Sequence, residues 1–273
     1  MWAVQDETPT IVPLLPDPDV RRWKFGDAIE LETRGPVDLE GIVVLPDGFI
    51  VSSEEGPRVI EVDRKGRYVR DIPLPPRLRE ARHNLSLESL TLSPNGRYLF
   101  TTTESALEHD GEVATQTAGA RVRFLRVDRS TGALTEHVYL TDPEQFEGSG
   151  VGISDFTALD EDRLLVLERG WSPRHGNTIR IYETALDARA ACTGVERLSA
   201  SSTALEKRLR VDLSDLSASG FPAAKQPQST PLLDNYEGMT LGPSLKNGRP
   251  SLILVSDDNA HADQFSRILV LAI

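Results

Sequence analysis

The sequence contains little cysteine, little aromatic character and no long apolar run. Cys192 is the only cysteine, which excludes an intrachain disulfide and any zinc site built from several thiolates. No stretch approaches the roughly 18 apolar residues that a membrane-spanning helix needs, so we expect no contact with a membrane. The first residues, MWAVQDETPTIVPLLP, lack the basic and apolar parts that are typical of a signal peptide.

Positive charge is also scarce. The chain has 30 Lys and Arg residues against 42 Asp and Glu residues, so its formal net charge is -12. Such a charge opposes binding to nucleic acid or to an anionic membrane through the overall field of the protein. We therefore expect no nucleic-acid partner, whereas an acidic chain is well suited to holding cations.

Several familiar catalytic motifs and long helices are missing as well. No G-x-S-x-G motif occurs, and the glycine-rich stretch EGSGVG at 147–152 has neither a following helix nor a Lys-Ser/Thr pair. The five histidines share no metal-ligand spacing. The best helical fragments, 78–81 and 204–208, are short, which indicates a fold built from strands.

One pattern occurs four times, in residues 38–56, 86–105, 152–170 and 235–259. A carboxylate is followed by a strand-forming run, a turn, a second strand-forming run and one or two closing carboxylates. The opening acids are Glu40, Glu88, Asp155 and Glu237. The closing acids are Glu54 and Glu55, Glu104, Glu168, and Asp257 and Asp258. Turn pairs such as Asp-Gly and Asn-Gly between such runs are strong hairpin signals.

The spacing of these acids predicts where they meet. The start of the first strand and the end of the second lie at the same end of a hairpin. In the first three repeats the turn is nearly midway between the two carboxylates. We therefore expect both acids of each repeat at the hairpin end opposite the turn.

Further strand-like segments follow the hairpins and complete a repeating unit. They cover 58–74, 121–140, 178–186 with 208–216, and 266–273. The unit is thus about four antiparallel strands, and repeated units of this kind predict an all-β protein, a β-propeller of four-stranded antiparallel blades. A sandwich of Greek keys is the alternative, but it gives no reason for a repeated acidic motif.

In a propeller, equivalent residues of the blades form a ring around the central channel. The repeated acids would then line one mouth, where each raises the pKa of its neighbours. Calcium, which takes about six to eight oxygen ligands, would relieve this repulsion. We expect Ca²⁺ as the cofactor, with Glu40, Glu88, Asp155, Glu237, Asp257 and Asp258 as its ligands. The alternative is that these acids only cap strands, accept backbone hydrogen bonds or face solvent.

The four segments also resemble a bacterial β-propeller family, the phytase-like domain described as "esterase-like activity of phytase". The resemblance runs from about Asp38 to the C-terminus and is most specific in NYEGMTLGPSLKNGRPSLILVSDDN, residues 235–259. It implies a hydrolase of phosphate or carboxylic esters with a small-molecule ligand, and a periplasmic or secreted location. The resemblance further implies that the acidic residues named above, and Arg169 in the sequence LERG, are functional residues.

The N-terminal residues divide the chain into a segment at 1–37 and a phytase-like propeller at 38–273. Members of the family usually have a further repeat upstream, so a propeller incomplete at its N-terminus is one expectation. Residues 28–32 have strand character. They would either pair with 266–273 as a closing strand or mark the remnant of a missing blade.

Two functions from different classes remain open at this point. In a metal-assisted hydrolase, the acids would hold calcium and Arg169 would bind a substrate oxyanion. One of Glu55, Glu104, Glu168 or Asp257 would then act as the general base. The alternative is a non-catalytic propeller that binds a ligand or partner and uses its acids structurally.

Overall fold

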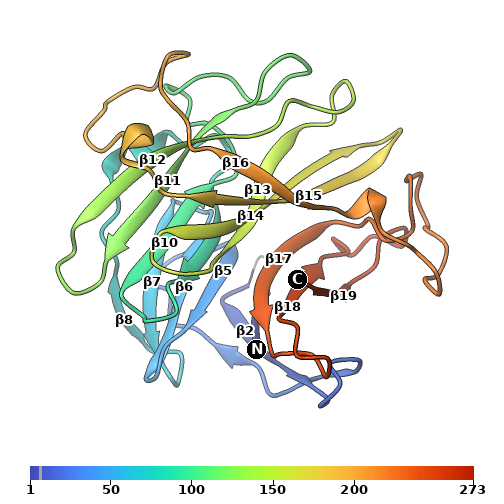
Figure 1. Cartoon of the computed structure of the whole chain (residues 1–273). Helices are drawn as coiled ribbons and strands as arrows, with labels where there is room; N and C mark the ends of the chain where they lie inside the picture. Colours follow the sequence, from blue (N-terminus) through green and yellow to red (C-terminus); the bar gives the residue numbers. More distant parts are fainter. Residues whose placement is uncertain (6–7) are drawn as a thin grey trace.

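The computed structural model describes residues 1–5 and 8–273, and antiparallel sheets make up almost all of its regular structure (Figure 1). The helices in these residues are single short 3₁₀ turns: η1 (Pro76–Glu80), η2 (Ala188–Ala190) and η3 (Leu213–Asp215). None of the described helices is long and apolar enough to cross a membrane.

The strands form five sheets, which we call blades 1 to 5 in chain order. Blade 1 contains β1 (Trp2–Gln5), β2 (Thr10–Pro16), β3 (Trp23–Phe25) and β4 (Ile29–Glu30). Blade 2 contains β5 (Leu39–Val44), β6 (Gly48–Ser53), β7 (Arg58–Asp63) and β8 (Tyr68–Asp71). Blade 3 contains β9 (Leu87–Leu92), β10 (Tyr98–Thr103), β11 (Arg121–Asp128) and β12 (Leu134–Leu140). Blade 4 contains β13 (Val151–Ala158), β14 (Arg163–Ser172), β15 (Gly176–Ala185) and β16 (Lys207–Asp212), and blade 5 contains β17 (Tyr236–Gly242), β18 (Ser251–Ser256) and β19 (Arg267–Ala272).

The blades follow one another around a common centre, which makes the fold a β-propeller (Figure 1). The first strands of successive blades, β1, β5, β9, β13 and β17, pack against each other in that order. The all-β propeller expected from the repeats is therefore confirmed. The four predicted hairpins are present, and the strand-like segments that follow them form the outer strands of their blades.

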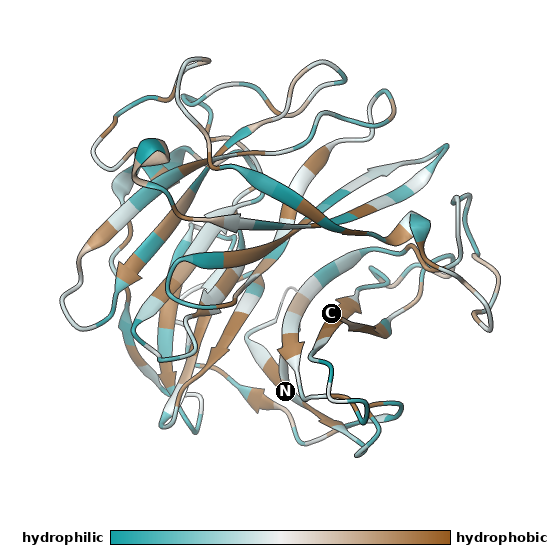
Figure 2. Ribbon diagram, viewed as in Figure 1, coloured by the Kyte–Doolittle hydropathy of each residue, from teal (hydrophilic) through white to brown (hydrophobic). Residues whose placement is uncertain are grey.

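Apolar side chains hold neighbouring blades together. Buried clusters lie between blades 1 and 2, 2 and 3, 3 and 4, and 4 and 5, and Figure 2 shows the corresponding apolar bands along the strands. Between blades 3 and 4, Phe124 stacks on Tyr139 with ring centres 4.6 Å apart and packs on Phe156 at 5.5 Å. The rigid blade contacts fix the relative positions of the strand ends that carry the acids.

The expected pairing of the N-terminal segment with the C-terminal strand is wrong. Ile29 and Glu30 pair with Ile11 and Thr10 of β2 within blade 1, whereas β19 pairs with β18. The physical reason is packing: Ile11 is fully buried, and Ile29 packs with it against the apolar cluster shared with blade 2. The other interpretation of this segment, the remnant of a missing blade, stays a prediction.

Candidate metal centre at the channel mouth

Each of the four inner hairpins has a β-bulge at its acidic end. In blade 3, Leu87 pairs with Thr103 and Ser89 with Thr102, so Glu88 is the extra residue on the inner strand. A bulge of this kind redirects the side chain of the extra residue. The shifted registers of the other hairpins place Glu40, Ser154 and Glu237 at the equivalent position.

The expectation that Asp155 is equivalent to Glu40, Glu88 and Glu237 is therefore wrong by one residue. Blade 4 has Ser154 where the other three blades have glutamate. The Asp155 carboxylate instead accepts hydrogen bonds from the amides of Phe156, at 2.7 Å, and Met239 of β17, at 2.6 Å. Burial raises its pKa well above the usual range, and both hydrogen bonds oppose that shift. Asp155 therefore fastens blade 4 to blade 5, and the structure does not bring it into the acidic group.

Blade 4 also differs from the other blades at the closing acid, the first carboxylate after the second strand run of each hairpin. The amides of Glu54, Glu104 and Asp257 donate to the carbonyls of Asp38, Ser86 and Asn235, respectively. In blade 4 the residue at this register is Arg169, which pairs with Gly152. Blade 4 thus replaces one carboxylate by a hydroxyl and another by a guanidinium.

Arg169 lies among the acids of the other blades. Its Nη1 donates to Asn235 Oδ1 at 2.6 Å, and its Nη2 is 3.3 Å from Glu237 Oε1 and 3.6 Å from Glu104 Oε1. Burial opposes the charged form of Arg169, but the charges of Glu237 and Glu104 raise its pKa. Gly152 makes room for Glu104, because a Cβ atom there would lie 2.6 Å from the Glu104 Oε1. Arg169 therefore stays charged and neutralises this side of the mouth.

The blade 2 side of the mouth carries a second group, formed by Asp38, Glu40 and Glu54. Carboxylate oxygens of these three partly buried residues lie within 4.8 Å of one another. Glu54 also accepts a hydrogen bond from the amide of Ser86 at 2.6 Å, and burial raises the pKa of its carboxyl group. Two oxygens bound to one calcium ion at about 2.4 Å can be at most about 5 Å apart, so this spacing suits a shared cation.

Glu88 lies between the two groups. Glu88 is only 8% exposed. Burial raises its pKa well above the usual range, and the charges of Glu104 and Glu40 raise it further. Burial and neighbouring negative charges therefore disfavour the ionised form of this carboxyl group. The all-oxygen donor set of Glu88 and the blade 2 acids fits a hard divalent cation such as calcium.

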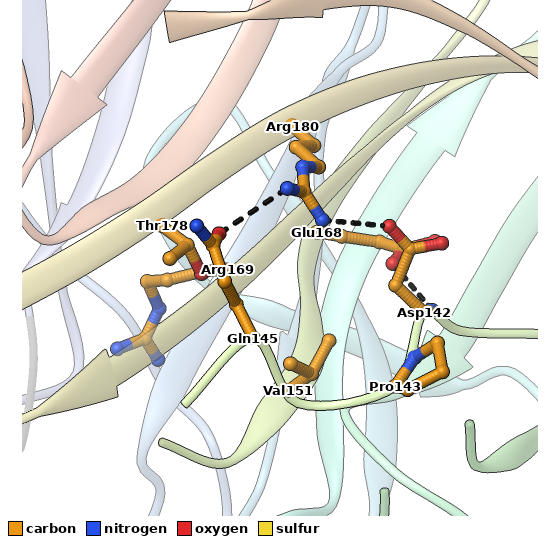
Figure 3. Close-up of a pocket in the computed structure, with 8 residues that line it drawn as sticks. All are labelled: Asp142, Pro143, Gln145, Val151, Glu168, Arg169, Thr178 and Arg180. Atoms are coloured by element: carbon orange, nitrogen blue, oxygen red, sulfur yellow. Dashed lines mark hydrogen bonds and ion pairs between the residues drawn. The ribbon is translucent and has the colours of Figure 1, made fainter. Parts of the chain in front are cut away.

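Glu168, predicted as a candidate base, points to the opposite face of β14. Its carboxylate accepts hydrogen bonds from Tyr139 Oη at 2.6 Å, Lys207 Nζ at 2.5 Å and the Asp142 amide at 2.8 Å. Figure 3 shows Glu168 beside Asp142 in this region. The pocket there has a volume of about 10 Å³, which is room for about one water molecule. Glu168 thus connects blades 3 and 4 and does not meet the acids around Arg169.

The remaining predicted residues lie at the rim. Burial raises the pKa of Glu237, Arg169 opposes that shift, and the charge of Asp257 adds to it, which places Asp257 near Glu237. Asp258 accepts a hydrogen bond from the amide of Ala260 in the following turn, at 3.0 Å. Glu55 is exposed, next to Glu54.

The sequence interpretation missed Asp38 and Asn235, which precede the bulged glutamates by two residues in DLEG and NYEG. Aligning the repeats on their apolar residues, rather than on their acids, would have found both. The residues Leu39, Leu87, Ile153 and Tyr236 precede the bulge in all four hairpins.

The fold and the site together define a β-propeller with a buried acidic mouth. The chain belongs to the phytase-like family described as esterase-like activity of phytase, whose model matches residues 4–260. This match begins well before Asp38, so it includes blade 1 and extends the resemblance found in the hairpins. No curated protein matches the chain.

Solved structures give more distant likenesses. A Lactobacillus plantarum protein has a TM-score of 0.43 and 16% identity, covering 97% of this chain and 61% of that protein. The WD40 domain of Neurospora crassa Pan2 has a TM-score of 0.34 and 14% identity, covering 92% of this chain and 67% of that domain. This chain therefore spans less than two thirds of the Lactobacillus plantarum protein. Likenesses at these TM-scores carry no argument about function.

Proposed function

We propose that the chain is a metal-assisted hydrolase of phosphate or carboxylic esters, with one calcium ion at the blade 2 side of the mouth. The observation that carries this proposal is the cluster of Asp38, Glu40 and Glu54, whose carboxylate oxygens lie within 4.8 Å of one another. The charge of Glu40 acts on the buried Glu88 of the neighbouring blade. Membership of the phytase-like family supports a hydrolase of this substrate class.

Asp38, Glu40 and Glu54 would hold the ion, with Glu88 completing the set from the neighbouring blade. A bound calcium would offset the repulsion between these acids, offset the negative charge of a phosphate and polarise the ester. Asp155 and Glu168 are not part of this set, because their oxygens already accept hydrogen bonds elsewhere.

Glu104 is the best candidate for the general base among the acids that the sequence singled out. Burial raises the pKa of its carboxyl group, while the charge of Arg169 opposes that shift. A carboxylate with a raised pKa accepts a proton more readily near neutral pH, as activation of an attacking water requires. Glu104 Oε1 would take that proton and later return it to the leaving oxygen.

Arg169 would stabilise the negative charge that develops on the substrate. Its side chain is 18% exposed, and its Nη2 contacts Glu104 and Glu237 at distances longer than direct hydrogen bonds. A substrate oxyanion could therefore approach the guanidinium from the mouth. Preorganised donors of this kind lower the barrier because they need no reorientation during the reaction.

The test is hydrolysis of 4-nitrophenyl phosphate, phytate and 4-nitrophenyl acetate by the cation-free chain before and after addition of calcium. We expect activity on at least one ester, increased by calcium and lost in Glu104→Gln. Glu112→Gln removes an exposed carboxylate in the loop between β10 and β11 and serves as the matched control. The hydrolase proposal fails if none of the three esters is cleaved at any calcium concentration.

A non-catalytic propeller that binds a ligand at the mouth is the second candidate. It is favoured by the contacts of Arg169, whose guanidinium is already matched by two carboxylates and Asn235. In that case calcium would bind and stabilise the chain, but no ester would be cleaved. The hydrolysis assay therefore separates the two candidates.

A further inference from the structure

Blade 4 differs from the other blades at the mouth in the length of its second strand. In blades 2, 3 and 5, the second strand ends at Ser53, Thr103 and Ser256. The equivalent residue of β14 is Glu168, but β14 continues to Ser172, which pairs with Gly176 of β15. The β14–β15 hairpin therefore extends beyond the ring of acids.

This extension carries Trp171 on the same face of β14 as Arg169. The pairing with β15 is regular there, with Arg169 opposite Ile179 and Trp171 opposite Asn177. Residues two apart in a regular strand share a face and are about 7 Å apart. Trp171 is 43% exposed, although tryptophan usually buries most of its surface.

The loop before β13 holds the extended hairpin in position. The amide of Trp171 donates to the carbonyl of Ser149 at 2.6 Å. The ring of Phe146 stacks on His175 at the hairpin tip, with ring centres 4.0 Å apart. These contacts fix the backbone that carries the exposed indole, so little conformational freedom remains to be lost when a ligand stacks on it.

We propose that Trp171 determines substrate specificity by stacking on a ring of the substrate, so that the preferred ligands are phosphate or carboxylic esters of a cyclic group. The inference rests on the proposed function of the mouth, because it takes the ester group to be bound beside Arg169. The separation of the two residues along β14 matches a ring attached directly to the ester group. Stacking between the indole and a ring would then add affinity for cyclic substrates and none for short-chain ones.

The test compares binding of two non-hydrolysable probes, phenylphosphonate and methylphosphonate, by calorimetry in the presence of calcium. The wild type should bind phenylphosphonate about tenfold more tightly than methylphosphonate, as expected for one aromatic contact. Trp171→Ala should remove this preference without changing the affinity for methylphosphonate or the melting temperature. Phe25→Ala, which removes a ring that is 76% exposed on β3 of blade 1, is the matched control and should change neither affinity.

The inference is overturned if wild type binds the two phosphonates equally, if it binds neither, or if Trp171→Ala keeps the preference. The failure of the proposed function has a different signature. In that case the phenyl preference and its loss in Trp171→Ala would persist, while none of the three ester substrates named above would be hydrolysed. The mouth would then bind cyclic anions without catalysis.

Discussion

Arg169 Nη2 lies 3.3 Å from Glu237 Oε1, across the boundary between blades 4 and 5. The guanidinium stands at the register where the other three hairpins carry a carboxylate. It supplies a permanent positive charge to one side of the mouth. On the other side, carboxylate oxygens of Asp38, Glu40 and Glu54 lie within 4.8 Å of one another, and this spacing is the reason that we propose an added ion there.

Removing the charge of Arg169 should destabilise the cation-free protein. In Arg169→Gln, the partly buried carboxylates of Glu104 and Glu237 would lose their counter-charge, which costs up to about 3 kcal/mol, the lower end for a fully buried ion pair. Urea unfolding without divalent cations measures the change. Arg210→Gln, at an exposed ion pair with Glu183, is the control and should change the free energy of unfolding by less than about 1 kcal/mol. Equal effects of the two substitutions would contradict the counter-charge assigned to Arg169.

Neutralising Glu88 should have opposite effects with and without calcium. The cation-free protein should melt at a higher temperature in Glu88→Gln, because burial and neighbouring charges disfavour the ionised carboxylate. Calcium at a hundredfold excess over its Kd stabilises the wild type by about 2.7 kcal/mol. We expect this stabilisation to be much smaller in the variant and unchanged in the control Glu112→Gln. Thermal unfolding with chelator and with calcium measures both effects, and an unchanged calcium shift in Glu88→Gln would remove Glu88 from the ligand set.

Asp155 should matter for stability and not for calcium. Asp155→Asn leaves one acceptor oxygen for two amide donors, those of Phe156 and Met239. An unsatisfied buried donor costs about 1–3 kcal/mol, so the free energy of unfolding should fall by that amount. Calorimetry should give the same calcium affinity as in the wild type. A large loss of calcium affinity would instead return Asp155 to the metal site.

The turn between β11 and β12 should stabilise the folded protein near neutral pH and lose this contribution in acid. Asp128 accepts hydrogen bonds from the Ser130 hydroxyl and from Arg97, and these lower its pKa to about 2. A lowered folded-state pKa stabilises the protein above the unfolded pKa of 3.8, and this contribution is lost as the pH falls towards about 2. The melting temperatures of wild type and Asp128→Asn should therefore differ at pH 6 and converge in this window. A difference that is the same at pH 6 and pH 2.5 would contradict the assignment.

The sequence predicted the propeller because its turns and strand runs are local signals. Lys65-Gly66 and Pro94-Asn95-Gly96 mark their turns whatever the rest of the chain does, and both lie between paired strands.

The arrangement of the site was only partly predictable, because bulges shift the side-chain face by one residue. Asp155 matched the acidic pattern, but Ser154 occupies the bulge in blade 4. Glu168 and Arg169 are neighbours in sequence and point to opposite faces, so only one of them can reach the mouth. The pairing of residues 29 and 30 with β2 depends on packing against blade 2, which no local signal records.

Calorimetric titration of calcium into the cation-free chain tests the metal centre most directly. The wild type should bind one ion with a Kd below about 1 mM, the weak end of protein calcium sites. Asp38→Asn should bind at least about tenfold more weakly, since it removes one charged ligand. Glu112→Gln should bind as the wild type does. No binding up to about 10 mM calcium, or equal binding by wild type and Asp38→Asn, would contradict a calcium centre at the blade 2 side of the mouth.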